Sequence, residues 1–148
     1  MGAAYFYHLT DTPLERTLPM LLGKCRAAGW RVAVRGAEAA LLERLDATLW
    51  NDGFLPHGMA GGLHDAEQPV LLGVDVAAEG FACLMSVGGA DVTSAEVGTL
   101  ERTCVLFDGH DDAALHHARG QWKALTSQGC KAQYWAQDDG RWVMKAEA

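Results

Sequence analysis

Short apolar runs alternate with segments of helical periodicity along most of this chain. A short continuous apolar run is typical of a strand buried on both faces, and an apolar repeat every three or four residues is typical of a half-buried helix. The sequence therefore predicts strands at residues 5–9, 31–35, 69–72, 83–87 and 103–107, and helices beginning near Thr12, over 37–49 and over about 111–127. This alternation predicts an α/β fold with a mainly parallel sheet covered on both faces.

Signals at the ends of these segments refine the prediction. Thr12-Pro13-Leu14-Glu15 has the form of a capping box with proline at the first helical position. Pro19 removes a helical hydrogen bond, which predicts either a kink there or a helix that begins near Thr17. Gly29 and Gly129 are predicted to end the first and third helices.

The C-terminal segment has a different pattern. Asp139-Gly140 lies between aromatic residues, which predicts an antiparallel hairpin at a sheet edge over residues 134–143. A short terminal helix is the alternative.

Composition sets the outer limits of function. A length of 148 residues with 49% hydrophobic content predicts one domain, residues 1–148. No secretory leader or membrane-spanning stretch is evident, so we expect a soluble, cytoplasmic protein with no membrane partner. The net charge of −7 opposes direct attachment to nucleic-acid phosphates, so we expect any contact with DNA to be indirect. The scattered cysteines form no CxxC pair and predict reduced thiols; they are Cys25, Cys83, Cys104 and Cys130.

Motifs for catalysis, cofactors and metals are weak. The turn after the first strand, Thr10-Asp11-Thr12-Pro13, lacks the glycines that let backbone amides approach phosphates. Gly88 and Gly89 follow a strand but lack the lysine of a P-loop, so the sequence predicts no nucleotide-binding loop. His116 and His117 are adjacent on a helix and diverge by about a hundred degrees, which disfavours a shared metal ion. We expect no catalytic residues, no cofactor and no metal.

Large apolar side chains in a loop give the first binding signal. Trp50, Phe54, Leu55 and Pro56 follow a helix that already has leucines for its buried face. They either fold back under the domain or form a partner surface. His57 is either a structural histidine bonded inside this loop or an acid or base in catalysis.

The third helix gives the second signal. Arg119 and Lys123 stand one turn apart and project the same way, with Trp122 beside them. One interpretation is a solvated helix face with Trp122 in the core. The other is an anion-binding notch in which the cations hold carboxylates and Trp122 borders an apolar slot.

Several segments together resemble the chi subunit of bacterial DNA polymerase III, and the resemblance spans nearly the whole chain. They are Phe6-Tyr7-His8-Leu9, Leu45-Asp46 with Leu49-Trp50, Phe54-Leu55-Pro56-His57-Gly58, Gln68-Pro69-Val70-Leu71-Leu72, Ala118-Arg119 with Trp122-Lys123, and Tyr134-Trp135 with Arg141-Trp142.

The resemblance implies a non-catalytic accessory protein with a Rossmann-like three-layer α/β fold and no nucleotide site. It implies a bridge between the psi subunit of the clamp loader and the acidic, phenylalanine-ended tail of single-stranded-DNA-binding protein. Carried over by motif, Trp50, Phe54, Leu55 and Pro56 would contact psi, and Arg119, Trp122 and Lys123 would hold the tail. The chain would be a monomer alone and a heterodimer with psi.

Two other classes stay open at this stage. One is a small α/β hydrolase or nucleotide-dependent enzyme that uses His57 and the glycine-rich loop around it. The other is an interaction module with a different client at the Trp50–Phe54 surface.

Overall fold

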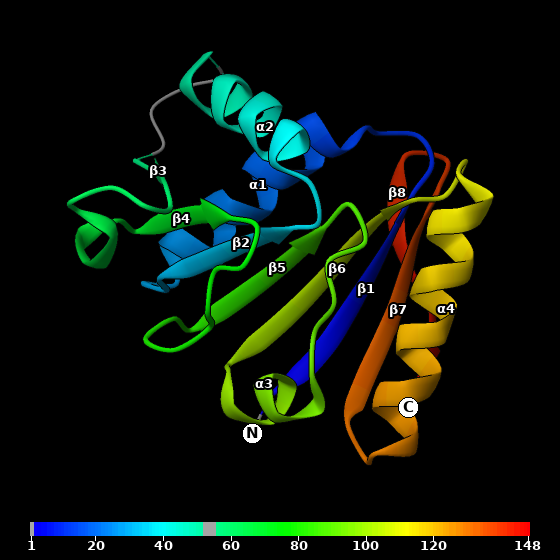
Figure 1. Cartoon of the computed structure of the whole chain (residues 1–148). Helices are drawn as coiled ribbons and strands as arrows, with labels where there is room; N and C mark the ends of the chain where they lie inside the picture. Colours follow the sequence, from blue (N-terminus) through cyan, green and yellow to red (C-terminus); the bar gives the residue numbers. More distant parts are fainter. Residues whose placement is uncertain (1, 52–55) are drawn as a thin grey trace.

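Strands and helices alternate along the chain in the computed structural model, which describes residues 2–51 and 56–148 (Figure 1). All five strands expected from apolar runs are present. The helices are α1 (Leu14–Ala27), α2 (Ala39–Asn51), α3 (Ser94–Thr99) and α4 (Asp112–Ser127), with a 3-10 helix, η1, over Asp65–Glu67. The strands are β1 (Ala3–Leu9), β2 (Val32–Gly36), β3 (Gly58–Met59), β4 (Val70–Gly73), β5 (Cys83–Val87), β6 (Arg102–Asp108), β7 (Lys131–Asp138) and β8 (Arg141–Glu147).

The strands form one 8-stranded sheet in the order β3-β4-β2-β5-β6-β1-β7-β8. Neighbouring strands are parallel except for the antiparallel β7–β8 hairpin. The adjacent strands β1 and β6 send their connections in opposite directions, toward β2 through α1 and toward β7 through α4. In open α/β sheets such a reversal leaves a crevice at the carboxyl ends of the strands, where ligands commonly bind.

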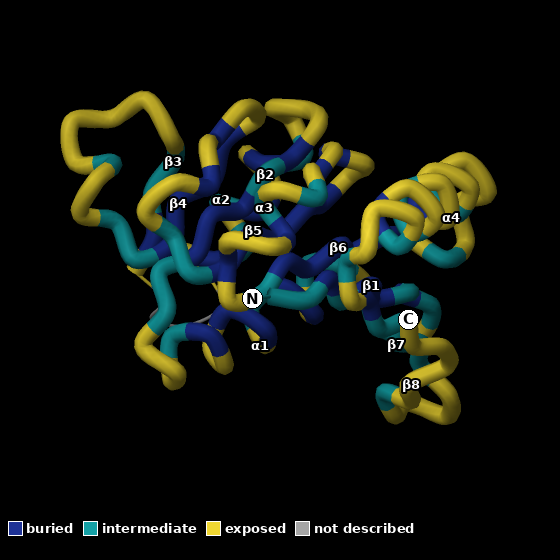
Figure 2. The backbone as a smooth tube through the Cα atoms, turned by 90° about the horizontal axis from the view of Figure 1, so that it is seen from below, coloured by how far each residue is buried: buried dark blue, intermediate teal, exposed yellow. Residues whose placement is uncertain are grey.

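Helices cover both faces of the sheet, which makes a three-layer, Rossmann-like sandwich. Leucines of α1 and α2 join one buried cluster, and residues of α3 and α4 join another. Strand β1 divides its side chains between the two, with Tyr7 and Leu9 in the first cluster and Ala4 and Phe6 in the second. Figure 2 shows burial concentrated in the central strands, while β8 and the outer side of α4 are exposed.

The predicted capping box at Thr12 is wrong. The N-cap of α1 is Pro13, which has extended backbone and forms no side-chain cap. Thr12 is instead held by Gln137 of β7: its N–H donates to Gln137 Oε1 at 3.0 Å, and its hydroxyl accepts from Gln137 Nε2 at 2.8 Å. A contact between segments 125 residues apart therefore replaces the local cap.

A helix start near Thr17 is also wrong. The Pro13 carbonyl accepts the N–H groups of Arg16 and Thr17 at 3.1 and 3.0 Å, so the first turn is closed before Pro19 is reached. The Thr17 hydroxyl donates to the same carbonyl at 3.1 Å. Helix α1 continues through Pro19 to Ala27.

The other predicted end signals are confirmed. Gly29 (φ 80°) and Gly129 (φ 87°) follow α1 and α4 in left-handed conformation, which L side chains rarely adopt. Asp139 (φ 52°) and Gly140 (φ 75°) form the turn of the β7–β8 hairpin, so the alternative of a terminal helix is wrong. The cysteines are free, with Cys130 only half-buried.

Helix α3 was not predicted. It is six residues long and begins with a capping box, in which the Thr93 hydroxyl accepts from the Glu96 N–H and the Glu96 carboxylate accepts from the Thr93 N–H. Glu96 also forms a two-point ion pair with Arg35 of β2, with N–O distances of 2.6 and 3.0 Å. The pair ties α3 to the carboxyl end of β2.

Candidate functional site

Two cations lie one turn apart on the exposed side of α4. Asp111 caps the first turn by accepting two backbone N–H bonds, at 3.0 and 3.2 Å, and the helix continues unbroken past both positions. Arg119 and Lys123 are exposed. Within the described part of the chain, neither side chain forms an ion pair or a hydrogen bond. Both charges are therefore available to an anion.

Trp122, between the two cations, packs against the sheet. Its ring meets Phe6 of β1 and Tyr134 of β7 edge-on, with centroid separations of 5.4 and 5.9 Å. The residue is nevertheless only half-buried. Trp122 thus contributes to the core while part of it stays at the surface beside Arg119 and Lys123.

Sequence reasoning missed two residues of this region, His8 and Tyr134. The Tyr134 hydroxyl lies 2.9 Å from His8 Nδ1. Burial lowers the pKa of His8, and the nearby Arg119 charge lowers it further. Burial raises the pKa of Tyr134 by more than the Arg119 charge lowers it. At neutral pH the histidine and the tyrosine are therefore uncharged, and the positive charge of the region comes from α4.

The sequence alone could place His8 but not Tyr134. Alternation along β1 puts His8 on the same face as Phe6. Tyr134 joins them because β7 pairs with β1 in the register that sets Phe6 beside Tyr134, and that pairing requires the strand order. We call Arg119, Trp122, Lys123, His8 and Tyr134 the α4 site.

The second predicted surface lies at the end of α2. The predicted loop position of Trp50 is wrong, because α2 continues to Asn51 and places Trp50 in its last turn. The residue is 62% exposed, which disfavours a role in the core. Pro56 is exposed as well. Phe54 and Leu55 lie outside the described residues. The structure therefore supports a surface role for Trp50 and Pro56 and does not test the other two predicted residues.

His57 connects this loop to α2. Its side chain is fully buried, and Nε2 lies 2.9 Å from Asp46 Oδ1 on α2. Its ring is also 4.3 Å from the Trp50 ring, centroid to centroid. These contacts agree with the structural interpretation of His57, because a buried ring held by a carboxylate and an indole is poorly placed to meet a substrate.

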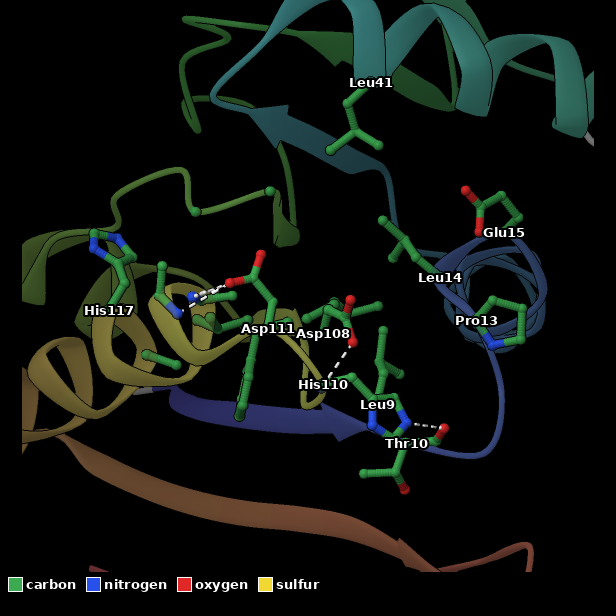
Figure 3. A pocket seen from close by; sticks show the side chains of 18 of the residues that line it. Leu9, Thr10, Pro13, Leu14, Glu15, Leu41, Asp108, His110, Asp111 and His117 are labelled. Carbon is green, nitrogen blue, oxygen red and sulfur yellow. Dashed lines mark hydrogen bonds between the residues drawn. The ribbon is translucent and has the colours of Figure 1, made fainter.

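A crevice of about 750 Å³ opens at the carboxyl ends of β1 and β6, where the sheet connections reverse (Figure 3). Leu14 and Leu41 approach it from one side, and Asp108, His110 and Asp111 from the other. Carboxylates outnumber cations among its lining residues: Asp11, Glu15, Asp108 and Asp111 against Arg44. This charge opposes phosphate binding.

The β1–α1 turn at the crevice is filled by the chain itself. The backbone N–H groups of Thr10, Asp11 and Thr12 converge on Gln137 Oε1, at 3.3, 2.9 and 3.0 Å. Converging amides in this turn are what dinucleotide-binding folds offer to a phosphate. Here a side-chain oxygen of β7 takes that position, so these amides are not available to a phosphate.

The histidines near α4 have separate partners. His117 Nε2 lies 3.1 Å from Asp91 Oδ1, and His110 Nε2 lies 2.8 Å from the Thr10 carbonyl oxygen. In residues 2–51 and 56–148, no group of three or more histidine, cysteine, aspartate or glutamate side chains could hold a metal ion.

A comparison with protein-family models identifies the family of the chain. Residues 1–133 match the family model described as DNA polymerase III chi subunit, HolC. No curated protein matches the chain. Among the described residues, no helix is both long and apolar enough to cross a membrane.

Proposed function

Because the chain belongs to the family of DNA polymerase III chi subunits, we propose that it joins the clamp loader to single-stranded-DNA-binding protein. Members of this family are accessory subunits of a polymerase that replicates DNA. In the proposed bridge, the α4 site holds the acidic tail of single-stranded-DNA-binding protein, and the surface around Trp50 and Pro56 contacts psi. The chain acts in the cytoplasm, as a monomer alone and as a heterodimer with psi, and reaches DNA only through its partners.

One observation supports tail binding most strongly. Arg119 and Lys123 are exposed cations without an anion in the described part of the chain, although the protein carries a net charge of −7. Half-buried Trp122 lies between them. A tail of aspartates that ends in an apolar side chain and a carboxylate needs this combination of cations and apolar surface.

The placement of the two surfaces supports a bridge. Helix α2 lies over the β4 end of the sheet, and α4 lies over β6 and β7 near the other end (Figure 1). Partners on these helices would approach different edges of the molecule, so they would not compete for space.

The alternative of a hydrolase or nucleotide-dependent enzyme gains no support from the geometry. His57 is buried against Asp46 and Trp50, and the amides of the β1–α1 turn are taken by Gln137. The alternative of a different client at the Trp50 surface predicts that psi does not bind the chain, or that Trp50→Ala leaves psi binding unchanged.

Calorimetric titration with a tail peptide tests the proposal. Arg119→Ala should weaken binding by about 1.5–3 kcal/mol, the contribution of a charge-assisted hydrogen bond, and affinity should fall as salt rises. Arg16→Ala is the matched control, because Arg16 is an exposed arginine of α1 without a side-chain partner in the described residues. Equal affinity of a folded Arg119→Ala variant and the wild type would remove Arg119 from the site.

A further inference from the structure

An apolar groove of about 420 Å³ lies on the face of the sheet opposite α4. Its lining residues come from α1, from the β7–β8 hairpin and from the strands between them. Four of its aromatic residues are only partly buried, namely Tyr5, Trp30, Trp135 and Trp142. We define the aromatic groove by Tyr5, Tyr7, Trp30, Arg102, Trp135 and Trp142.

Arg102 is the unusual residue of the groove. Its guanidinium lies over the rings of Tyr5 and Trp30, 4.3 and 5.3 Å from the centroids. Within the described residues it donates no side-chain hydrogen bond and forms no ion pair. Arg31 also lies over an aromatic ring but donates to three backbone carbonyls, and Arg35 is paired with Glu96. Two rings thus hold the Arg102 guanidinium, and its N–H donors have no acceptor among the described residues.

The groove is positively charged in an acidic protein. Among the described residues that line it, Lys24 and Arg102 are cations and none carries a carboxylate. The hydroxyl and thiol at its floor supply no countercharge: burial raises the pKa of Tyr7, and a hydrogen bond with Cys83 together with burial raises the pKa of Cys25. Guanidinium groups whose donors face a carboxylate form strong, geometrically specific pairs. Charge complementarity therefore points to an anionic ligand.

We propose that the aromatic groove binds an acidic peptide segment of a partner protein, with a side-chain carboxylate on Arg102 and an adjacent apolar side chain among the tryptophans. This surface is separate from the α4 site and from the Trp50 surface of the proposed function. Exposed apolar surface extends to both sides of the groove: Met20, which lines it on α1, and Met144, which lies opposite Trp135 on β8, are each 42% exposed. An extended peptide uses this continuation, whereas a small anionic molecule would leave it uncovered. Methionine side chains adapt easily to a peptide surface.

Selection from a displayed library of random twelve-residue peptides tests the proposal on the full chain. The peptides are fused at their C-termini, so only side chains supply carboxylates and a free tail terminus is excluded. Recovered peptides should combine aspartate or glutamate with an apolar residue. A synthetic copy of one should bind the wild type saturably and Arg102→Met at least 10-fold more weakly, because charge-assisted contacts are lost.

Lys24→Glu is the second variant, for the case in which loss of the Arg102 stacking disturbs the fold. Lys24 is exposed at the rim of the groove, and its reversal should weaken binding about 5-fold or more. Arg16→Glu reverses an exposed charge on the same helix outside the groove and should leave binding unchanged. The peptide should also stay bound when a tail peptide of single-stranded-DNA-binding protein saturates the α4 site.

Three results would overturn the proposal. The first is that every recovered peptide binds Arg102→Met and Lys24→Glu as tightly as it binds the wild type. The second is recovery of basic or uncharged peptides only. The third is displacement by the tail peptide together with loss of binding in Arg119→Ala, which would assign the acidic peptides to the α4 site and leave the proposed function intact.

Discussion

Gln137 should be one of the strongest stabilising contacts outside the hydrophobic core. Its Oε1 accepts three backbone N–H bonds from Thr10, Asp11 and Thr12, and its Nε2 donates to the Thr12 hydroxyl at 2.8 Å. A net contribution of about 1 kcal/mol is typical of a neutral hydrogen bond. The four bonds do not add fully, because the three amides share one oxygen and water can hydrate the Asp11 amide after truncation. We therefore expect Gln137→Ala to lower the free energy of unfolding by about 2–3 kcal/mol, which is less than four full hydrogen bonds would contribute.

Thermal unfolding measures this cost directly. In a domain of this size about 2–3 kcal/mol corresponds to a fall in Tm of roughly 4–12 °C. Gln137→Glu keeps an acceptor oxygen for the amides and should recover at least half of the loss. Gln128→Ala, at an exposed glutamine without a side-chain hydrogen bond in the described residues, is the control and should change stability by less than about 0.5 kcal/mol. A Gln137→Ala variant as stable as this control would refute the inference that the side chain fills the turn.

Gly109→Ala should lower the free energy of unfolding, measured with denaturant, by about 2–3 kcal/mol, because an added Cβ would overlap the His8 ring. Gly120→Ala should instead stabilise α4 by up to about 1 kcal/mol, because its Cβ would meet nothing within 4 Å. Glu96→Gln should cost about 2 kcal/mol at pH 7, because the hydrogen-bonded Arg35 guanidinium lowers the pKa of the folded Glu96 carboxyl. The stability that ionised Glu96 contributes is present above the unfolded pKa of 4.5 and is lost as pH falls through the lower pKa of the folded state. Free energies of unfolding of the wild type and Glu96→Gln, measured in urea, should therefore converge in acid and differ at neutral pH. Trp50→Ala should lower Tm by less than about 5 °C because the side chain is 62% exposed, and a larger fall would make this residue part of the core.

The fold was largely predictable because its signals are local. Apolar runs located the buried strands, and Gly29 and Gly129 ended the helices through their own backbone preference. Thr12 shows where this reasoning fails: its local context fits a capping box, but Gln137, far along the chain, supplies the partner. Helix α3 was missed because a helix of one or two turns has too few apolar positions to show a period.

Some residues of the candidate sites could be predicted from the sequence, and others could not. The spacing of Arg119 and Lys123 on one helix is enough to set their common direction, because it depends only on the helical repeat. The contribution of Tyr134 depends on β7 lying beside β1, and the free guanidinium of Arg102 depends on which rings surround it. Neither the strand order nor the identity of neighbours across the sheet follows from periodicity.

The bridge is the central claim, and native mass spectrometry of a three-component mixture tests it most directly. The mixture contains the chain, a psi subunit and a tail peptide of single-stranded-DNA-binding protein. We predict a 1:1:1 complex, in which Arg119→Ala removes only the peptide and Trp50→Ala removes only psi, because distant sites act independently. Displacement of psi by the peptide, or loss of both partners in one folded variant, would contradict a bridge with two separate surfaces.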